Sequence, residues 1–302
     1  MDSVPVEATN ERIRDAFQLL ANETRLEILF ALWNAPEWTA TFTELKDAVG
    51  MRDSGQFQYH LNQLAGTFIR RTDDGYTHLA SGIALYRAML GSVAGTESID
   101  SIPLDEFCPD CENRLRLTYE NQVFFARCSA CDETVLSSPF LPAGLDNRID
   151  DERLWAFDRW TRRLVGNLRD GVCPWCASRV NHELSVEDST ESSAESEGGS
   201  NVRIVHTCNR CGGFLKTTVG ENVIDHPAVI SFFYDRGKDI TSIPHWKLDF
   251  CTSDEGVELI SEEPVEIRLT IREAGDELRL LFGDDCSVTE ISRAEPRDST
   301  HK

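Results

Sequence analysis

Eight of the ten cysteines occur as four Cys-x2-Cys pairs, a spacing that lets one tight turn present two thiolates to a metal ion. The first two pairs are separated by residues 112–127, which number 16, an interval typical of a four-cysteine zinc site. Four thiolates fill a tetrahedral shell and leave no position for water or substrate, so the predicted role is structural. We predict two Zn2+ ions per chain; a rubredoxin-like iron site is the alternative, and disulfides are not expected without a secretion signal. The predicted ligands are Cys108, Cys111, Cys128 and Cys131 for one ion, and Cys173, Cys176, Cys208 and Cys211 for the other.

The second quartet has a wider interval, residues 177–207, which number 31. Within it, residues 187–201 contain no apolar side chain larger than alanine, and this composition predicts a solvated, disordered loop. Without those 15 residues the interval is again 16, which is compatible with a tandem duplication. The two remaining cysteines, Cys251 and Cys286, stand alone and are predicted to be buried small hydrophobic residues.

A second group of residues suited to chemistry lies in the segment 53–64, which is predicted to be a helix capped by Asp53. Phe57, Leu61 and Leu64 recur at helical spacing and form its buried stripe, which leaves amide and hydroxyl side chains on the opposite face. Asn and Gln can pair bidentately with adenine, so this face is a candidate for reading base edges, while an ordinary amphipathic surface helix is the alternative. The predicted DNA-contacting residues are Arg52, Ser54, Gln56, Gln58, Tyr59, Asn62, Gln63, Arg70, Arg71 and His78.

The elements around this helix predict how it is held. Two helices are expected within residues 11–35, and Thr41 and Glu44 form a capping box that opens a short helix ending at Gly50. A tight turn then leads into the helix at 53–64, which is the helix-turn-helix pattern. Residues 68–79 follow as a β-hairpin with Asp-Gly at its turn. Together these elements predict a winged helix.

The segments LLANETRLEILFALW, FTELKDAVG, GQFQYHLNQL and IRRTDDGYTHLA resemble the ArsR-like winged-helix transcriptional regulators of archaea, over residues 11–91. This resemblance implies binding to double-stranded DNA. It also implies a homodimer formed through the helix at 80–93, although that helix is equally able to pack on its own domain. The metal-sensing branch of the family carries cysteines in the helix before the recognition helix, and residues 43–49 have none. Metal-triggered release at that helix is therefore not expected.

The composition is strongly acidic, with 52 Asp and Glu against 30 Lys and Arg and a formal net charge of −22. This excess resembles the halophilic proteins of archaea, and an acidic protein of a mesophile is the alternative. Residues 1–95 hold 12 acidic and 8 basic side chains, so the predicted DNA-binding part is the least repulsive to a polyanion. No run of 18 apolar residues and no signal peptide is found, which predicts a cytoplasmic protein without a membrane partner.

The expected fold class is multidomain α+β. Four modules are predicted: a winged helix-turn-helix at 1–95, a zinc ribbon with an amphipathic helix at 104–170, a second zinc ribbon at 171–222, and a small α+β module at 223–302. No phosphate loop, nucleophile–base pair or open metal site is present, so no enzyme is predicted. The favoured function is a sequence-specific transcriptional regulator. The alternative is a basal transcription or adaptor protein that uses the same modules to contact RNA polymerase or another transcription factor.

Overall fold

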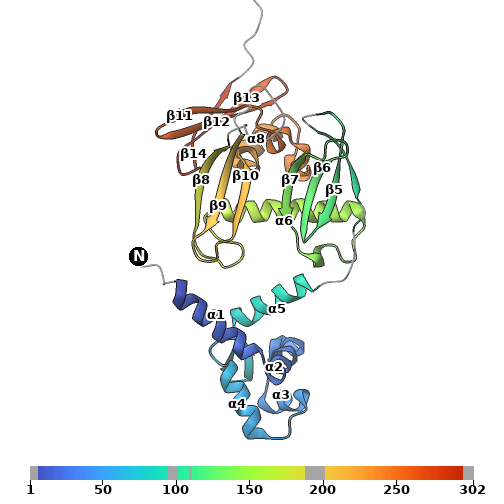
Figure 1. Ribbon diagram of the computed structural model, residues 1–302, viewed down its shortest axis with the longest axis vertical. Coiled ribbons are helices and arrows are strands. Elements are labelled where there is room, and N and C mark those ends of the chain that lie inside the picture. Colours follow the sequence, from blue (N-terminus) through green and yellow to red (C-terminus); the bar gives the residue numbers. More distant parts are fainter. Residues whose placement is uncertain (1–5, 94–98, 100, 109–110, 188–200, 295–302) are drawn as a thin grey trace, which may run out of the picture. The chain divides into compact units, whose positions relative to one another are not determined.

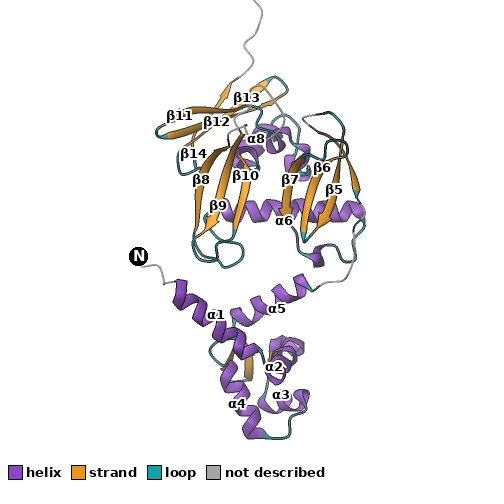
Figure 2. Ribbon diagram, viewed as in Figure 1, coloured by secondary structure: helices purple, strands orange, loops and turns teal. Residues whose placement is uncertain are grey.

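The computed structural model describes residues 6–93, 99, 101–108, 111–187 and 201–294. The chain forms two compact units, residues 1–94 and 95–302, and combines helices with antiparallel sheets in an α+β fold (Figures 1 and 2). In the described part of the chain, no helix is both long and apolar enough to cross a membrane. The further division of residues 95–302 into three modules stays a prediction.

The first unit consists of five α-helices and a small sheet among its described residues. Its three strands are antiparallel, in the order β1-β3-β2. Gly75 begins β3 with a φ of 135°, and a Cβ there would lie 2.3 Å from the carbonyl oxygen of Ala40, so only glycine allows β3 to approach β1 this closely. The elements are α1 (Val6–Leu20), α2 (Glu23–Asn34), β1 (Thr39–Ala40), α3 (Phe42–Val49), α4 (Ser54–Leu64), β2 (Ile69–Thr72), β3 (Gly75–His78) and α5 (Ala80–Ser92).

The predicted caps set the helix boundaries in this unit. The Asn22 side chain accepts a hydrogen bond from the Arg25 backbone N–H, and Thr41 and Glu44 form the reciprocal capping box of α3. Gly50 ends α3 in the left-handed conformation at φ 70°, and Asp53 caps α4 through the Gln56 N–H at 2.9 Å. These caps satisfy backbone groups that would otherwise be unpaired, so α3 and α4 are separated by a defined turn.

The core of the first unit lies between α2, α3, α4 and the sheet. Phe57 of α4 is fully buried and packs edge-on against Phe42 of α3, with the ring centroids 5.1 Å apart. The predicted stripe of α4 is confirmed, because all of its members are buried. Fully buried members of this core include Ile28, Leu32, Leu45, Phe57, Leu61, Leu64 and Ile69.

The second unit contains three antiparallel sheets, with the orders β4-β5-β6-β7, β10-β9-β8 and β11-β12-β13-β14. Strand β4 begins at Ile102, two residues before the predicted start of the first ribbon module at 104. The elements are β4 (Ile102–Phe107), β5 (Arg114–Glu120), β6 (Val123–Cys128), β7 (Thr134–Pro139), α6 (Asp150–Arg169), β8 (Val180–Glu187), β9 (Asn201–Cys208), β10 (Phe214–Thr218), α7 (Val219–Val223), α8 (Pro227–Tyr234), α9 (Asp249–Thr252), β11 (Val257–Glu262), β12 (Val265–Glu273), β13 (Asp276–Phe282) and β14 (Val288–Ala294).

Helix α6 packs on two of these sheets (Figure 1). In its first half, Phe157 joins the core of the β4–β7 sheet, and in its second half, Leu164 and Leu168 join the core beneath the β8–β10 sheet. Trp155 and Trp160 of the same helix are each 40% exposed. The indole rings lie at the border of the buried face of α6. That face includes two charged residues, Asp158 and Arg162.

A buried ion pair joins α6 to distant parts of the second unit. Arg162 donates to the Asp158 carboxylate at 3.1 and 3.2 Å, to Asp225 at 3.2 Å, and to the carbonyls of Ile240 and Ile243 at 3.1 and 2.6 Å. Arg162 is thus occupied by buried partners and is not available for contacts at the surface.

The predicted loop at 187–201 lies mostly outside the described residues. Its two ends belong to strands, since Glu187 of β8 pairs with Asn201 of β9. The remaining residues of the predicted loop, 188–200, lie outside the described part of the chain.

We expect Arg162→Met to lower the free energy of unfolding by about 3–5 kcal/mol, because Asp158 would remain buried without its cation. Chemical denaturation measures the effect. The control is Arg163→Met on the exposed side of the same helix, for which a change within about 0.5 kcal/mol is expected. If both substitutions changed the free energy of unfolding by the same amount, the buried ion pair would contribute no more to stability than an exposed arginine.

Replacing residues 188–200 with Asn-Gly should leave metal content and melting temperature nearly unchanged. The paired ends are already positioned for a two-residue hairpin turn, and long surface insertions change the closure entropy only slightly. Elemental analysis and thermal unfolding test this. A shift of several degrees or a lost ion would assign the insertion a structural role.

Candidate metal centres and nucleic-acid surface

The four Cys-x2-Cys turns share one backbone geometry. In each, the residue four positions after the first cysteine has a positive φ: Glu112 at 57°, Asp132 at 59°, Ala177 at 56° and Gly212 at 69°. In at least three of the turns its N–H donates to the carbonyl of that first cysteine, as from Glu112 to Cys108 at 3.0 Å. This turn folds the chain back so that both sulfur atoms point to the same side.

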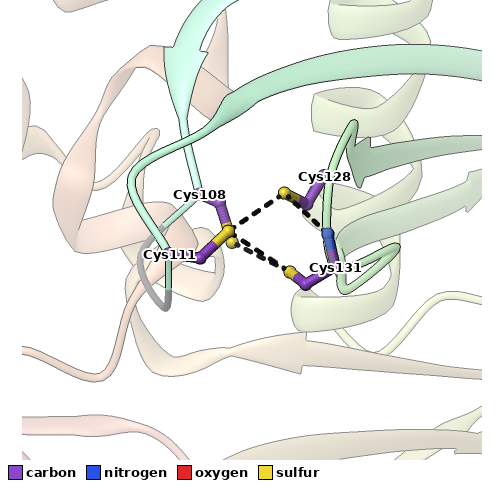
Figure 3. A group of neighbouring side chains, drawn as sticks. All are labelled: Cys108, Cys111, Cys128 and Cys131. Atoms are coloured by element: carbon purple, nitrogen blue, oxygen red, sulfur yellow. Dashed lines mark hydrogen bonds between the residues drawn. The ribbon is translucent and has the colours of Figure 1, made fainter.

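The first quartet forms between two such turns (Figure 3). Cys108 follows β4, Cys128 ends β6, and Cys131 lies in the turn before β7. The sulfur–sulfur distances are 3.7 Å for Cys108–Cys131, 3.3 Å for Cys111–Cys128 and 3.5 Å for Cys111–Cys131. A tetrahedral ion with Zn–S bonds near 2.3 Å requires sulfur atoms about 3.8 Å apart. The quartet can therefore hold one metal ion after small adjustments.

The second quartet repeats this arrangement between the turn before β8 and the turn that joins β9 to β10. Cys173 and Cys211 are 3.7 Å apart, and Cys176 and Cys208 are 3.5 Å apart. In both quartets all four sulfur atoms lie within 4.8 Å of one another. Two four-cysteine groups compatible with zinc are thus present.

Electrostatics in the quartets favour a bound cation. Hydrogen bonds from the side chain and backbone of Asn113 lower the pKa of Cys111 to about 6. Burial opposes the ionisation of Cys208, yet the backbone N–H groups of Cys211 and Arg210 lower its pKa to about 6. Burial and the neighbouring thiols raise the pKa of Cys176 to about 12. The first cysteine of a quartet to ionise does so readily, but its negative charge hinders ionisation of the neighbouring thiols. A divalent cation is therefore needed for all four thiols of a quartet to ionise together.

Each pair also has the same burial pattern. The first cysteine of each, Cys108, Cys128, Cys173 and Cys208, is buried in a core cluster, whereas the second lies nearer the surface. A metal ion would therefore join the surface turn to the core below it. With four sulfur ligands the shell is complete, so these centres are suited to structural rather than catalytic use.

The residues predicted to contact DNA mostly lie on the surface of the first unit. Gln58 and Gln63 are half-buried, and the Gln58 amide donates to Asn62 at 2.9 Å. Arg70 and Arg71 are exposed on the edge strand β2. The exposed residues of α4 and of the turn before it are Arg52, Ser54, Gln56, Tyr59 and Asn62.

His78 does not share this surface. It is only 6% exposed, and its ring packs against Trp33 with centroids 6.1 Å apart. Along β3, Tyr76 and His78 both point inward, as the alternation of a strand requires. We therefore leave His78 out of the candidate surface.

Two histidines far apart in the sequence form a pair that was not predicted. His182 and His206 face each other across β8 and β9, with their Nδ1 atoms 3.0 Å apart, and the Nε2 of His206 lies 3.0 Å from the Thr217 hydroxyl. Their separation in sequence hid this contact. The contact follows from the antiparallel register of the two strands. Because Val180 pairs with Cys208, His182 must lie opposite His206.

The purified protein should contain two zinc ions per chain by elemental analysis. Cys108→Ser and Cys173→Ser should each remove one ion, because three thiolates cannot complete the shell. The control is Cys251→Ala, which replaces a buried cysteine outside both quartets and should leave two ions. Iron in place of zinc, or eight free thiols without metal, would contradict this expectation.

Comparisons with known proteins match two family models. Residues 13–89 match a domain of unknown function (DUF7347), and residues 105–288 match another domain of unknown function (DUF7351). No curated protein matches the chain. The second match spans more than half of the 302 residues, so the chain belongs to the family described as domain of unknown function DUF7351.

Proposed function

We propose that this protein is a sequence-specific, double-stranded-DNA-binding transcriptional regulator of the ArsR-like winged-helix type. The observation that carries the proposal is the exposed polar face of α4, on a helix whose opposite face is anchored in the core and whose start is fixed by a cap. Polar side chains on a rigid, protruding helix are what base recognition in the major groove needs.

The connection between α3 and α4 supports this proposal. Gly50 in the left-handed conformation ends α3, and Asp53 caps α4 three residues later. This is the short, glycine-containing turn of a helix-turn-helix. In this arrangement α4 is the recognition helix, and the Gln58–Asn62 pair presents neighbouring amides to base edges.

The β2–β3 hairpin is the proposed wing. Its exposed Arg70 and Arg71 are suited to contacts with phosphate oxygens, which position a protein on DNA without reading sequence. Residues 1–95 carry more acidic than basic side chains, so general attraction to the phosphate backbone is weak. Base contacts from α4 must then supply a large share of the affinity.

A homodimer is the proposed binding form. Apolar side chains of α1 and α5 are exposed, including Phe17 at 65% and Met89 at 55%. Ile13 and Leu90 extend the apolar surface of the same two helices. A second copy of the chain would cover these groups, and two recognition helices would then contact a two-fold symmetric operator.

Both cysteine quartets are proposed to hold structural Zn2+ in ribbon-like modules. The sulfur spacing and the strands on either side of each turn support this assignment.

An adaptor function is the second candidate, and one observation favours it. Trp155 and Trp160 are exposed on α6, and the Arg159 guanidinium lies 5.5 Å from the Trp155 ring. Tryptophan and arginine are enriched at protein interfaces, so this face of α6 fits a contact with RNA polymerase or another transcription factor.

Gln58→Ala or Asn62→Ala should relax the base preference at one operator position, at a cost of about 1–3 kcal/mol, and should leave non-specific binding nearly intact. Arg70→Ala or Arg71→Ala should weaken binding to all sequences alike and flatten its salt dependence. Selection from a randomised DNA pool, with binding titrations at several salt concentrations, measures both effects.

Phe57→Ala is the stability control, since it opens a cavity in the core and should lower the free energy of unfolding by about 3–5 kcal/mol. Its loss of DNA binding should track its unfolding. Unchanged base preferences in both amide variants would argue against direct readout by α4. The adaptor function would be favoured by two results together: the parent protein shows no operator preference, and the Trp155→Ala variant no longer associates with RNA polymerase.

A further inference from the structure

The first cysteine module, formed by the first quartet and strands β5–β7, and the second, formed by the second quartet and strands β8–β10, share one backbone. In each, the residue seven positions after the first cysteine pairs with the third cysteine, as Leu115 with Cys128 and Val180 with Cys208. In each, the residue after that third cysteine donates its N–H to the carbonyl of an arginine, at 3.0 and 3.1 Å. The two modules can therefore be compared position by position, and their differences lie in the side chains.

The residues around the two quartets carry opposite net charge. In the first module, residues 106–117 and 121–138 contain five acidic and three basic side chains. The matched residues of the second module, 171–182 and 201–218, contain four basic side chains and no acidic one. A Zn2+ ion with four thiolates would have the same charge in either module, so metal binding does not explain the difference. A basic region in a chain with a net charge of −22 indicates an anionic partner.

Two arginines of the second module are free to contact such a partner. Arg179 and Arg210 are exposed, and neither forms an ion pair with another residue of the described chain. The N–H of Asn209 donates to the Arg179 carbonyl at 3.1 Å, which places the two arginines on adjacent segments. An exposed guanidinium without a carboxylate partner can bind a phosphate group bidentately. In the first module the arginines are paired with carboxylates: Arg114 with Asp105 at 3.3 Å, Arg116 with Asp132 at 2.9 Å and Arg127 with Glu120 at 2.9 Å.

Two exposed aromatic rings belong to the same turns. Trp175, inside a Cys-x2-Cys turn, is 48% exposed, and Phe214, which begins β10, is 66% exposed. The indole lies against Gly213, where a Cβ would be 2.7 Å from a ring carbon, so this position must be glycine for the ring to rest there. The first module has Glu133 and Thr134 at the positions of Gly213 and Phe214. The second module thus displays a ring supported by backbone, with a second ring one residue away from that support.

We propose that the turns of the second cysteine module bind single-stranded nucleic acid. Trp175 and Phe214 stack on unpaired bases, while Arg179 and Arg210 contact the phosphates. Bases in a duplex stack on one another and do not offer their faces, so a single strand fits these rings better than double-stranded DNA does. RNA and single-stranded DNA share this chemistry. The site lies within the second unit, so it does not depend on whether the first unit reads an operator.

Fluorescence anisotropy of the full chain with oligouridylate and oligothymidylate of about 16 nucleotides tests the class of ligand. Saturable binding to at least one strand is expected, and the tighter strand identifies the preferred sugar. The affinity should fall as salt rises, because contacts between arginine and phosphate release counterions. Absence of saturable binding to both strands would overturn the proposal. Equally effective competition by polyglutamate of the same length would also overturn it, since that polymer offers charge without bases.

Three variants assign the binding to these turns. Phe214→Thr and Trp175→Asp should each weaken binding about fivefold or more, the loss expected for one stacked base. Arg210→Ala should weaken binding and lower the slope of log affinity against log salt by about 0.7, as expected for one phosphate contact on a single strand. Each variant introduces the residue that the first module carries at the matched position, so the turns should keep their metal, which elemental analysis checks.

The control is Phe107→Ala, which removes an exposed ring beside the first quartet. Phe107 is 58% exposed and lies 5.5 Å from the guanidinium of Arg114, whose charge is paired with Asp105. This variant should bind both strands as the parent does. Parent-like affinity in all three variants of the second module, or an equal loss in Phe107→Ala, would place the binding elsewhere and refute the site.

Discussion

Asp158 and Arg162 pair inside the second unit and draw together segments that lie 63 to 87 residues further along the chain. The Asp158 carboxylate also accepts from the backbone N–H of His245 at 2.7 Å and from its ring Nδ1 at 2.9 Å. A desolvated pair of this kind is stable only when every remaining donor and acceptor is satisfied, so α6 and the segment around residues 240–245 must take one arrangement. Trp246 then stacks on Phe157, which joins that segment to the core of the first cysteine module.

The two cysteine modules depend on metal to different degrees. The first quartet sits on a broad core that includes Leu117, Phe124 and Phe157. The buried cluster at the second quartet has five members, and two of them, Cys173 and Cys208, are candidate ligands themselves. Away from the turns the same sheet packs in a larger core through Val202, so the small cluster is confined to the cysteine turns themselves. Metal binding should therefore contribute more to holding the cysteine turns of the second quartet than to holding those of the first.

Local signals in the sequence predicted much of this structure, and long-range contacts account for most of what was missed. Caps at Asn22, Thr41 and Asp53, and the four Cys-x2-Cys turns, are encoded within a few residues and appear as predicted. The burial of Arg162 and the contact between His182 and His206 depend on partners brought together by the tertiary fold, which residue type alone does not reveal. His78 has a polar side chain on a hairpin that was expected to be exposed, but the alternation of β3 turns it inward.

In the proposed function, the first unit recognises an operator and the metal-supported second unit provides regulation or further contacts. A genome-wide map of DNA occupancy, made by crosslinking the full protein in its own cells, tests the central claim directly. A sequence-specific regulator of this type should give discrete sites that share a two-fold symmetric motif. A profile that follows RNA polymerase across active genes, without a common motif, would contradict the account and support the adaptor function.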